Sequence, residues 1–218
     1  MPFETYTHVA KDVIDYVKTQ FGDEADIQIT DAHIIRWINA GQREIIQKNT
    51  TINEVKVSTA VVSGQGEYNL PSTFADMLLV NSLLYDGALV EKTDFNSAMN
   101  LVSSTPSATG APSVWWVKAN TLNLYPVPDV DIASGLTLYY TKSPTAISNT
   151  GDALSVPDNY FNALVQYVIK QAYELDENFQ AAAAKQSEFV DEINSQQNQT
   201  SDHGNSFPVI QYDEGDVW

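Results

Sequence analysis

Residues 30–44, Thr30-Asp-Ala-His-Ile-Ile-Arg-Trp-Ile-Asn-Ala-Gly-Gln-Arg-Glu44, decide the fold class. Their apolar side chains recur every three or four residues, which is the spacing of one helix face. The members of this face are Ile34, Trp37, Ile38, Gly41 and Ile45. Thr30 or Asp31 suits the N-cap position, so we predict a helix from there to about residue 49. Gly41 costs about 1 kcal/mol against Ala inside a helix, which indicates the close approach of another element.

Two further blocks of the chain have the same helical period. Residues 5–21 form an amphipathic pattern that ends at Gly22, a suitable helix stop. After Pro157, a second block carries an apolar face and continues, past a break at residues 176–178, to about residue 195. These stripes are too wide to face water, so we predict that the blocks form one helical bundle. The predicted bundle core includes Trp37, Ile38, Phe161 and Leu164.

Between the helical blocks the period changes from 3.6 to 2, which is typical of strands. Residues 55–61 alternate, and residues 68–71 are predicted to close a first hairpin with them. Asp86-Gly87 favours a tight turn between residues 77–85 and 88–92. Asp94 is predicted to cap a short helix, and Ala119-Asn120 to form the turn of another hairpin.

Trp115 and Trp116 are neighbours in one of these predicted strands. Adjacent strand positions face opposite sides, so one indole is expected in the core and the other facing out. The outward indole would either contact a partner or be half-covered by a neighbouring loop.

The predicted fold class is therefore α+β. A helical bundle, with two N-terminal and one or two C-terminal helices, is interrupted by a small antiparallel β-rich domain and followed by an extended C-terminal tail. The predicted boundaries are 1–54 for the N-terminal helices, 55–148 for the β-rich insertion, 149–197 for the C-terminal helices and 198–218 for the acidic tail.

Composition restricts the partners and the chemistry. The chain of 218 residues has 28 acidic and 11 basic residues, a net charge of −17, and no cysteine. Residues 151–218 alone hold twelve acids and two bases. Such a surface repels nucleic acid rather than gripping it. The absence of Cys excludes a thiolate metal site, a disulfide framework and a Cys nucleophile. We find no secretory signal and no apolar run long enough for a membrane span, and expect a soluble protein made in a reducing cytosol.

No catalytic or metal-binding pattern stands out, and we predict no cofactor. His8, His33 and His203 lie in different segments without a ligand partner at helical spacing. Glu67, Asp76 and Asp86 lie beside the aromatic residues Tyr68, Phe74 and Tyr85, which is a feature of sugar clefts. A carbohydrate-binding or carbohydrate-cleaving protein is therefore the alternative function, although these aromatics also suit the core of the insertion.

The order of these signals resembles the head-to-tail adaptor (connector) proteins of tailed bacteriophages, particularly short-tailed ones. The resemblance covers roughly residues 8–197. It is carried by the segments TDAHIIRWINAGQRE (30–44), YNLPSTF (68–74), LYDG (84–87), GAPSVW (110–115), LNLYPVP (122–128), LTLYYT (136–141), VPDNYFNALVQY (156–167) and AYEL (172–175).

The resemblance implies a structural protein of the virion, not an enzyme. It implies a homo-oligomeric ring, usually of twelve copies, that lies beneath the portal protein, binds a tail or nozzle protein below and continues the DNA channel. Double-stranded DNA would pass without specific binding, no membrane would be involved, and assembly would take place in the host cytoplasm before the ring joins the head-tail junction.

The C-terminal tail combines acidic residues with large apolar side chains. Its predicted partner-binding residues are Phe207, Val209, Ile210, Tyr212 and Trp218. Such a segment is expected to become ordered only on a partner, either the portal protein or a neighbouring subunit. A solvated tail without a partner is the alternative.

Overall fold

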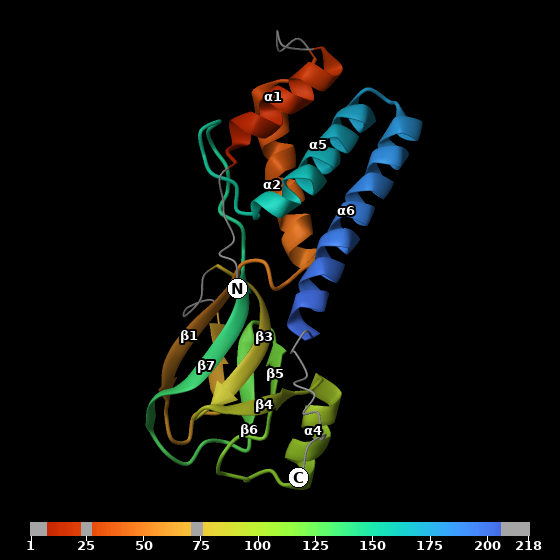
Figure 1. The fold of residues 1–218 in the computed structure, drawn as a ribbon. Coiled ribbons are helices and arrows are strands. Elements are labelled where there is room, and N and C mark those ends of the chain that lie inside the picture. Colours follow the sequence, from red (N-terminus) through yellow and green to blue (C-terminus); the bar gives the residue numbers. More distant parts are fainter. Residues whose placement is uncertain (1–7, 23–27, 71–75, 206–218) are drawn as a thin grey trace, which may run out of the picture. The chain divides into compact units, whose positions relative to one another are not determined.

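The computed structural model describes residues 8–22, 28–70 and 76–205, with side-chain surroundings given as far as Gln197. The chain forms two compact units, Met1–Gly41 together with Ile147–Trp218, and Gln42–Ala146. The first unit is helical and the second contains the sheet, as Figure 1 shows. The α+β class predicted from the sequence, a helical bundle interrupted by a β-rich segment, is confirmed. The predicted extended tail from residue 206 onward lies outside the described residues.

The helical unit contains α1 (Ala10–Phe21), most of α2 (Asp31–Lys48), α5 (Phe161–Leu175) and α6 (Phe179–Asn205). α5 packs against both α1 and α6. The Tyr167 and Phe189 rings join α5 to α6 with centroids 5.4 Å apart, and the Phe21 and Tyr173 rings join α1 to α5 at 4.8 Å. Gly22 ends α1 with a φ of 62°, a conformation that glycine adopts without a steric penalty, as predicted.

α1 begins later than the sequence pattern indicated. Val9 is extended and bridges to Ala153, so the helix starts at Ala10 rather than near residue 5. The Ala10 backbone N–H donates to the Asp152 carbonyl at 3.0 Å, and the Lys11 N–H donates to the Thr150 carbonyl at 2.7 Å. The loop that precedes α5 therefore caps the start of α1.

The helices α2 and α5 approach closely at Gly41. A Cβ placed there would lie 2.7 Å from Leu164 Cδ1 and 2.8 Å from Tyr167 Cδ1, both on α5. The predicted role of Gly41, to admit another element, is confirmed. Two residues before Gly41, Asn39 also exchanges hydrogen bonds with the backbone of Ile147, at 2.9 and 2.7 Å, which fixes the returning chain beside α2.

The second unit contains β1 (Glu54–Val61), β2 (Glu67–Asn69), β3 (Met77–Tyr85), β4 (Ala88–Lys92), α4 (Phe95–Ser104), β5 (Val114–Lys118), β6 (Thr121–Tyr125) and β7 (Ile132–Lys142). Within the described residues the sheet has the strand order β1-β7-β3-β4-β5-β6-β2. The predicted hairpins β3–β4 and β5–β6 are confirmed, with Asp86 and Gly87 at positive φ in the first turn and Ala119 and Asn120 in the second.

The predicted first hairpin is wrong. β2 pairs with β6, with Tyr68 opposite Leu122, whereas β1 pairs with β7 from the far end of the unit. Both pairings are long-range, and the Gly64-Gln-Gly66 turn only leads the chain from one edge strand to the other. One local turn signal therefore could not identify the partner strands.

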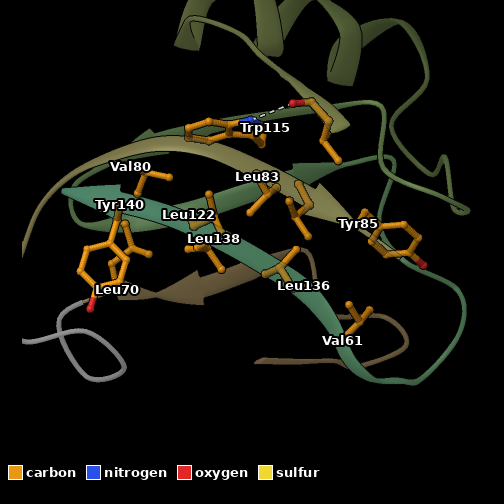
Figure 2. Close-up of a cluster of buried hydrophobic side chains, with 12 residues drawn as sticks. Val61, Leu70, Val80, Leu83, Tyr85, Trp115, Leu122, Leu136, Leu138 and Tyr140 are labelled. Atoms are coloured by element: carbon orange, nitrogen blue, oxygen red, sulfur yellow. Dashed lines mark hydrogen bonds between the residues drawn. The ribbon is translucent and has the colours of Figure 1, made fainter. Parts of the chain in front are cut away.

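The sheet curls around a core that Figure 2 shows in close-up. Trp115 is fully buried in this core, and its indole N–H donates to the Val90 carbonyl at 3.1 Å. Leu83, Leu136 and Leu138 are also fully buried there.

Trp116 points away from this core but is also buried. It packs with Ala98, Val114 and Tyr125 beneath α4, and only 6% of it is exposed. Trp116 thus faces away from the core of the sheet as predicted. The prediction that it contacts a partner or is half-covered by a loop is wrong, because α4 covers this face of the sheet. Asp94 caps this helix as predicted, accepting hydrogen bonds from the Asn96 and Ser97 N–H groups at 2.9 and 3.1 Å.

The last helix is longer than predicted. The polar residues after Ser195 were expected to form a linker, but α6 continues to Asn205. Glutamine is a good helix former, and this stretch has no Pro or Gly before Gly204, so nothing ends the helix earlier.

We predict that Gly41→Ala destabilises the protein. In an open helix this substitution is stabilising by about 1 kcal/mol, but here the new methyl group would overlap Leu164 and Tyr167. Overpacking of this kind costs about 1–3 kcal/mol. The measurement is the free energy of unfolding from urea denaturation. The matched control is Gly151→Ala, because no atom lies within 4 Å of a Cβ at Gly151. Equal effects of the two substitutions would contradict the close α2–α5 contact.

Candidate interaction surfaces

The residues predicted to form the bundle core lie in the helical unit. Trp37, Ile38 and Leu164 are buried. Phe161 is only partly buried and stacks on the His8 ring, with centroids 3.9 Å apart. Phe161 therefore holds the chain just before α1 instead of filling the centre of the bundle.

The five predicted partner-binding residues of the tail, Phe207, Val209, Ile210, Tyr212 and Trp218, lie outside the described residues. Their role remains a prediction, taken up below.

The histidines that the structure describes are tied to neighbouring groups. His8 Nδ1 lies 3.3 Å from Asp12 Oδ2, and the His33 ring stacks on Trp37 with centroids 5.9 Å apart. Within residues 8–22, 28–70 and 76–205, no group of three or more His, Asp or Glu side chains is placed to hold a metal ion. Across the same residues, no helix is both long and apolar enough to cross a membrane.

The carboxylates of the hypothetical sugar cleft are not brought together as a pair. Asp76 and Asp86 lie at opposite ends of the nine-residue strand β3, which spans about 30 Å. Glycosidase carboxylates lie about 5–9.5 Å apart, so these two cannot act as a pair. Asp76 is instead 3.2 Å from the Lys142 ammonium and accepts a hydrogen bond from the Tyr140 hydroxyl at 3.3 Å.

The aromatic residues proposed for the same cleft serve the core. Burial raises the pKa of the Tyr85 hydroxyl, and the nearby charges of Asp129 and Asp86 add to the effect. Burial also raises the pKa of Tyr68, whose hydroxyl accepts a hydrogen bond from the Val62 N–H at 3.4 Å. Phe74 lies outside the described residues. The described aromatics of this hypothetical cleft, Tyr68 and Tyr85, therefore pack against the core of the sheet unit.

Two carboxylates with lowered pKa values have structural duties. The Ser97 hydroxyl, aided by the backbone N–H groups of Ser97 and Asn96, lowers the pKa of Asp94 at the start of α4. The backbone N–H groups of Ser148 and Asn149 lower the pKa of Asp152, which closes the loop before α5. Both charges therefore stabilise the backbone turns that they cap.

Exposed apolar side chains, which sequence periodicity missed, mark the candidate interaction surfaces. In the helical unit, Leu175 and Phe179 flank the α5–α6 turn with 51% and 68% of their surface exposed. In the sheet unit, Leu79, Phe95 and Val117 are exposed around one cavity of about 460 Å³. Large apolar side chains that gather around a hollow typically mark a protein–protein contact. A sequence signal for the second surface is the shortness of the predicted strand at residues 88–92.

The α+β fold thus exposes large apolar side chains on both of its units, within the part of the chain that the structure describes. The sequence model of the SU10 adaptor protein family matches residues 8–210. The chain belongs to this family and is a bacteriophage adaptor, a structural protein of the head-tail junction that interacts with portal and tail proteins. A comparison with curated proteins finds no match.

We predict that Asp94 and Asp152 contribute to stability above about pH 4 and that this contribution is lost below it. Their pKa values are lowered in the folded state, so the unfolded state binds more protons as the pH falls through the ordinary Asp value of about 3.9. Asp94→Asn and Asp152→Asn should each lower the urea midpoint at pH 7 and reduce its fall between pH 7 and pH 3.

The control for this experiment is Glu91→Gln. The exposed Glu91 side chain accepts no hydrogen bond from the described residues, so its substitution should leave the acid dependence unchanged. If Asp94→Asn behaved like this control, the capping role of Asp94 would be contradicted.

Proposed function

We propose that the protein forms a homo-oligomeric ring, of twelve copies, beneath the portal of a short-tailed bacteriophage. The ring joins the portal to a tail or nozzle protein and continues the DNA channel. The observation that carries this proposal is the match of the adaptor family over residues 8–210, nearly the whole chain. The subunits are assembled in the host cytoplasm and then incorporated at the head-tail junction.

The charge of the chain supports a channel function. With 28 acidic against 11 basic residues, the surface cannot neutralise many phosphates, and neutralised phosphates are the main source of non-specific affinity for DNA. Double-stranded DNA would therefore pass through the ring without specific binding and without adhering to its wall.

The tail of the chain supports an attachment function. Phe207, Val209, Ile210, Tyr212 and Trp218 would bind the portal protein or a neighbouring subunit, while Asp213, Glu214 and Asp216 would face basic groups on that partner. Pro208 and Gly215 oppose a helix, so an extended bound form is expected.

Electron microscopy of the purified protein mixed with its portal protein tests the proposed assembly. Twelvefold rings on the narrow end of the portal are expected. A monomer that leaves the portal bare under all salt conditions would overturn the proposal, and binding of such a monomer to oligosaccharides would favour the carbohydrate alternative instead.

We predict that deletion of residues 206–218 weakens assembly. The amount of protein that cosediments with the portal should fall, and the remaining attachment should depend less on salt, because three carboxylates are removed. The matched control keeps the three acids and replaces the five large apolar residues with Ser. We expect this control to lose affinity while it keeps the salt dependence. Unchanged attachment after the deletion would mean that the tail has no partner.

A further inference from the structure

Between the described strands of the sheet unit there is a gap that is one strand wide. β4 lies between β3 and β5 but has only five residues. It pairs with β3 from Leu83 to Tyr85, and with β5 only through Glu91 and Lys92. After Lys92 the chain turns away into α4, capped by Asp94. Beyond this point, no described strand lies between residues 77–80 of β3 and residues 116–118 of β5.

The dimensions of this gap suit one added strand. β3 and β5 are each one position from β4, so they are separated by about two strand spacings, roughly 10 Å, where β4 ends. The cavity at this place has a volume of about 460 Å³, and Met77, Val80, Thr93 and Asn120 are among its lining residues. Among the described residues, no strand therefore occupies this position in the sheet.

On the side of the gap, the first residues of β3 pair with no described strand. The Val80 carbonyl accepts a hydrogen bond from the Lys92 ammonium at 3.3 Å, a donor that stands where a strand N–H would otherwise lie. Unpaired strand edges of this kind bind extended peptides by adding a strand, with backbone hydrogen bonds giving affinity. An extended segment is thus the shape of ligand that the gap favours.

The side chains around the gap define the chemistry of the ligand. Leu79 and Val117, exposed by 43% and 42%, and Phe95 offer apolar contacts. The Lys118 ammonium lies 3.0 Å from the Phe95 ring centroid, and the Lys92 ammonium 5.1 Å from that of Trp115. Among the described residues, neither lysine has a carboxylate within ion-pair distance. The one acid at the rim, Asp94, is already occupied by the N–H groups of Asn96 and Ser97 and by the Ser97 hydroxyl.

An acidic segment with alternating apolar side chains would match these features, and this chain carries one. Residues 209–216, Val-Ile-Gln-Tyr-Asp-Glu-Gly-Asp, combine Val209, Ile210 and Tyr212 with three carboxylates. Pro208 would stand at the start of the added strand, where its missing N–H costs least. The thirteen residues from 206 to 218 can extend by about 45 Å.

We propose that residues 209–216 of one copy add a strand to the gap between β3 and β5 of a neighbouring copy. Each copy donates one tail and receives another, and a head-to-tail contact of this kind generates a ring when the rotation closes. This inference rests on the proposed ring and names the neighbouring subunit, rather than the portal, as the receiver of the tail.

Disulfide trapping between two differently substituted chains tests this proposal. The chain has no cysteine, so every disulfide comes from the introduced residues. One preparation carries Val117→Cys, and a second carries Val209→Cys or, separately, Ile210→Cys, because neighbouring strand positions face opposite sides. The two full-length preparations are mixed and treated with a mild oxidant. Only a contact between copies yields the mixed disulfide.

The matched control is Val130→Cys in place of Val117→Cys. Val130 is exposed to a similar degree, 47%, but does not line the gap. We expect at least one tail position to give about tenfold more mixed disulfide with Val117→Cys than with Val130→Cys, since a disulfide requires closely apposed Cα atoms. Lys118→Glu in the Val117→Cys chain should reduce the yield several-fold, whereas Lys56→Glu, whose lysine also lies over an aromatic ring, should not.

Equal yields at Val117 and Val130, or no mixed disulfide at either, would overturn the proposal. A disulfide that forms only when both cysteines are in one chain would also overturn it, because the tail would then fold back on its own subunit. Electron microscopy of the same mixtures separates this result from the proposed function. Rings on the portal without preferential trapping at Val117 would leave the ring in place and refute only the tail contact.

Discussion

The close approach of α2 and α5 at Gly41 is the constraint on which the helical unit depends. The two helices are more than a hundred residues apart in the sequence, and the intervening segment forms most of a second unit. A Cβ at position 41 would overlap Leu164 and Tyr167, so only glycine permits this packing. The hydrogen bonds between Asn39 and Ile147 fix the returning chain about half a turn before Gly41 on α2. The insertion can therefore vary without disturbing the bundle, provided that both ends return to this crossing.

Local signals in the sequence predicted the elements that depend on neighbouring residues. Asp86-Gly87 identified one hairpin, Ala119-Asn120 another, and Asp94 the start of α4, because turns and caps are formed by the residues that specify them. Gly41 predicted a close contact but not its partner. The pairings of β1 with β7 and of β2 with β6 were not predicted, since strand alternation identifies the buried face but not the strand beside it.

The same reasoning explains what was missed at the candidate interaction surfaces. Trp116 is buried in addition to Trp115 because α4 lies on the outer face of the sheet, and the Tyr125 hydroxyl helps to hold α4 there by donating a hydrogen bond to the Thr105 carbonyl. The gap beyond β4 follows from the parallel pairing of β4 with β5, which a reading of successive hairpins does not anticipate. The tail residues could be identified only by composition, as large apolar side chains in a polar segment.

Charge limits how copies of this chain can assemble. Each copy carries a net charge of −17, so two copies repel one another unless apolar contacts and well-placed cations offset the repulsion. Several lysines of the described chain are already occupied: Lys11 by Asp15, Lys142 by Asp76, Lys170 by Glu174 and Lys185 by Glu188. Lys92 and Lys118 are instead held against aromatic rings beside exposed apolar side chains. A lysine over an aromatic ring keeps its charge available to an incoming carboxylate at little cost in side-chain entropy.

Because exposed charges are screened within about 10 Å at moderate salt, repulsion between copies weakens with salt while apolar contacts persist. An assembly formed from this chain is therefore governed by two opposing salt effects, and the local arrangement of lysines, not the net charge, decides where acidic segments attach.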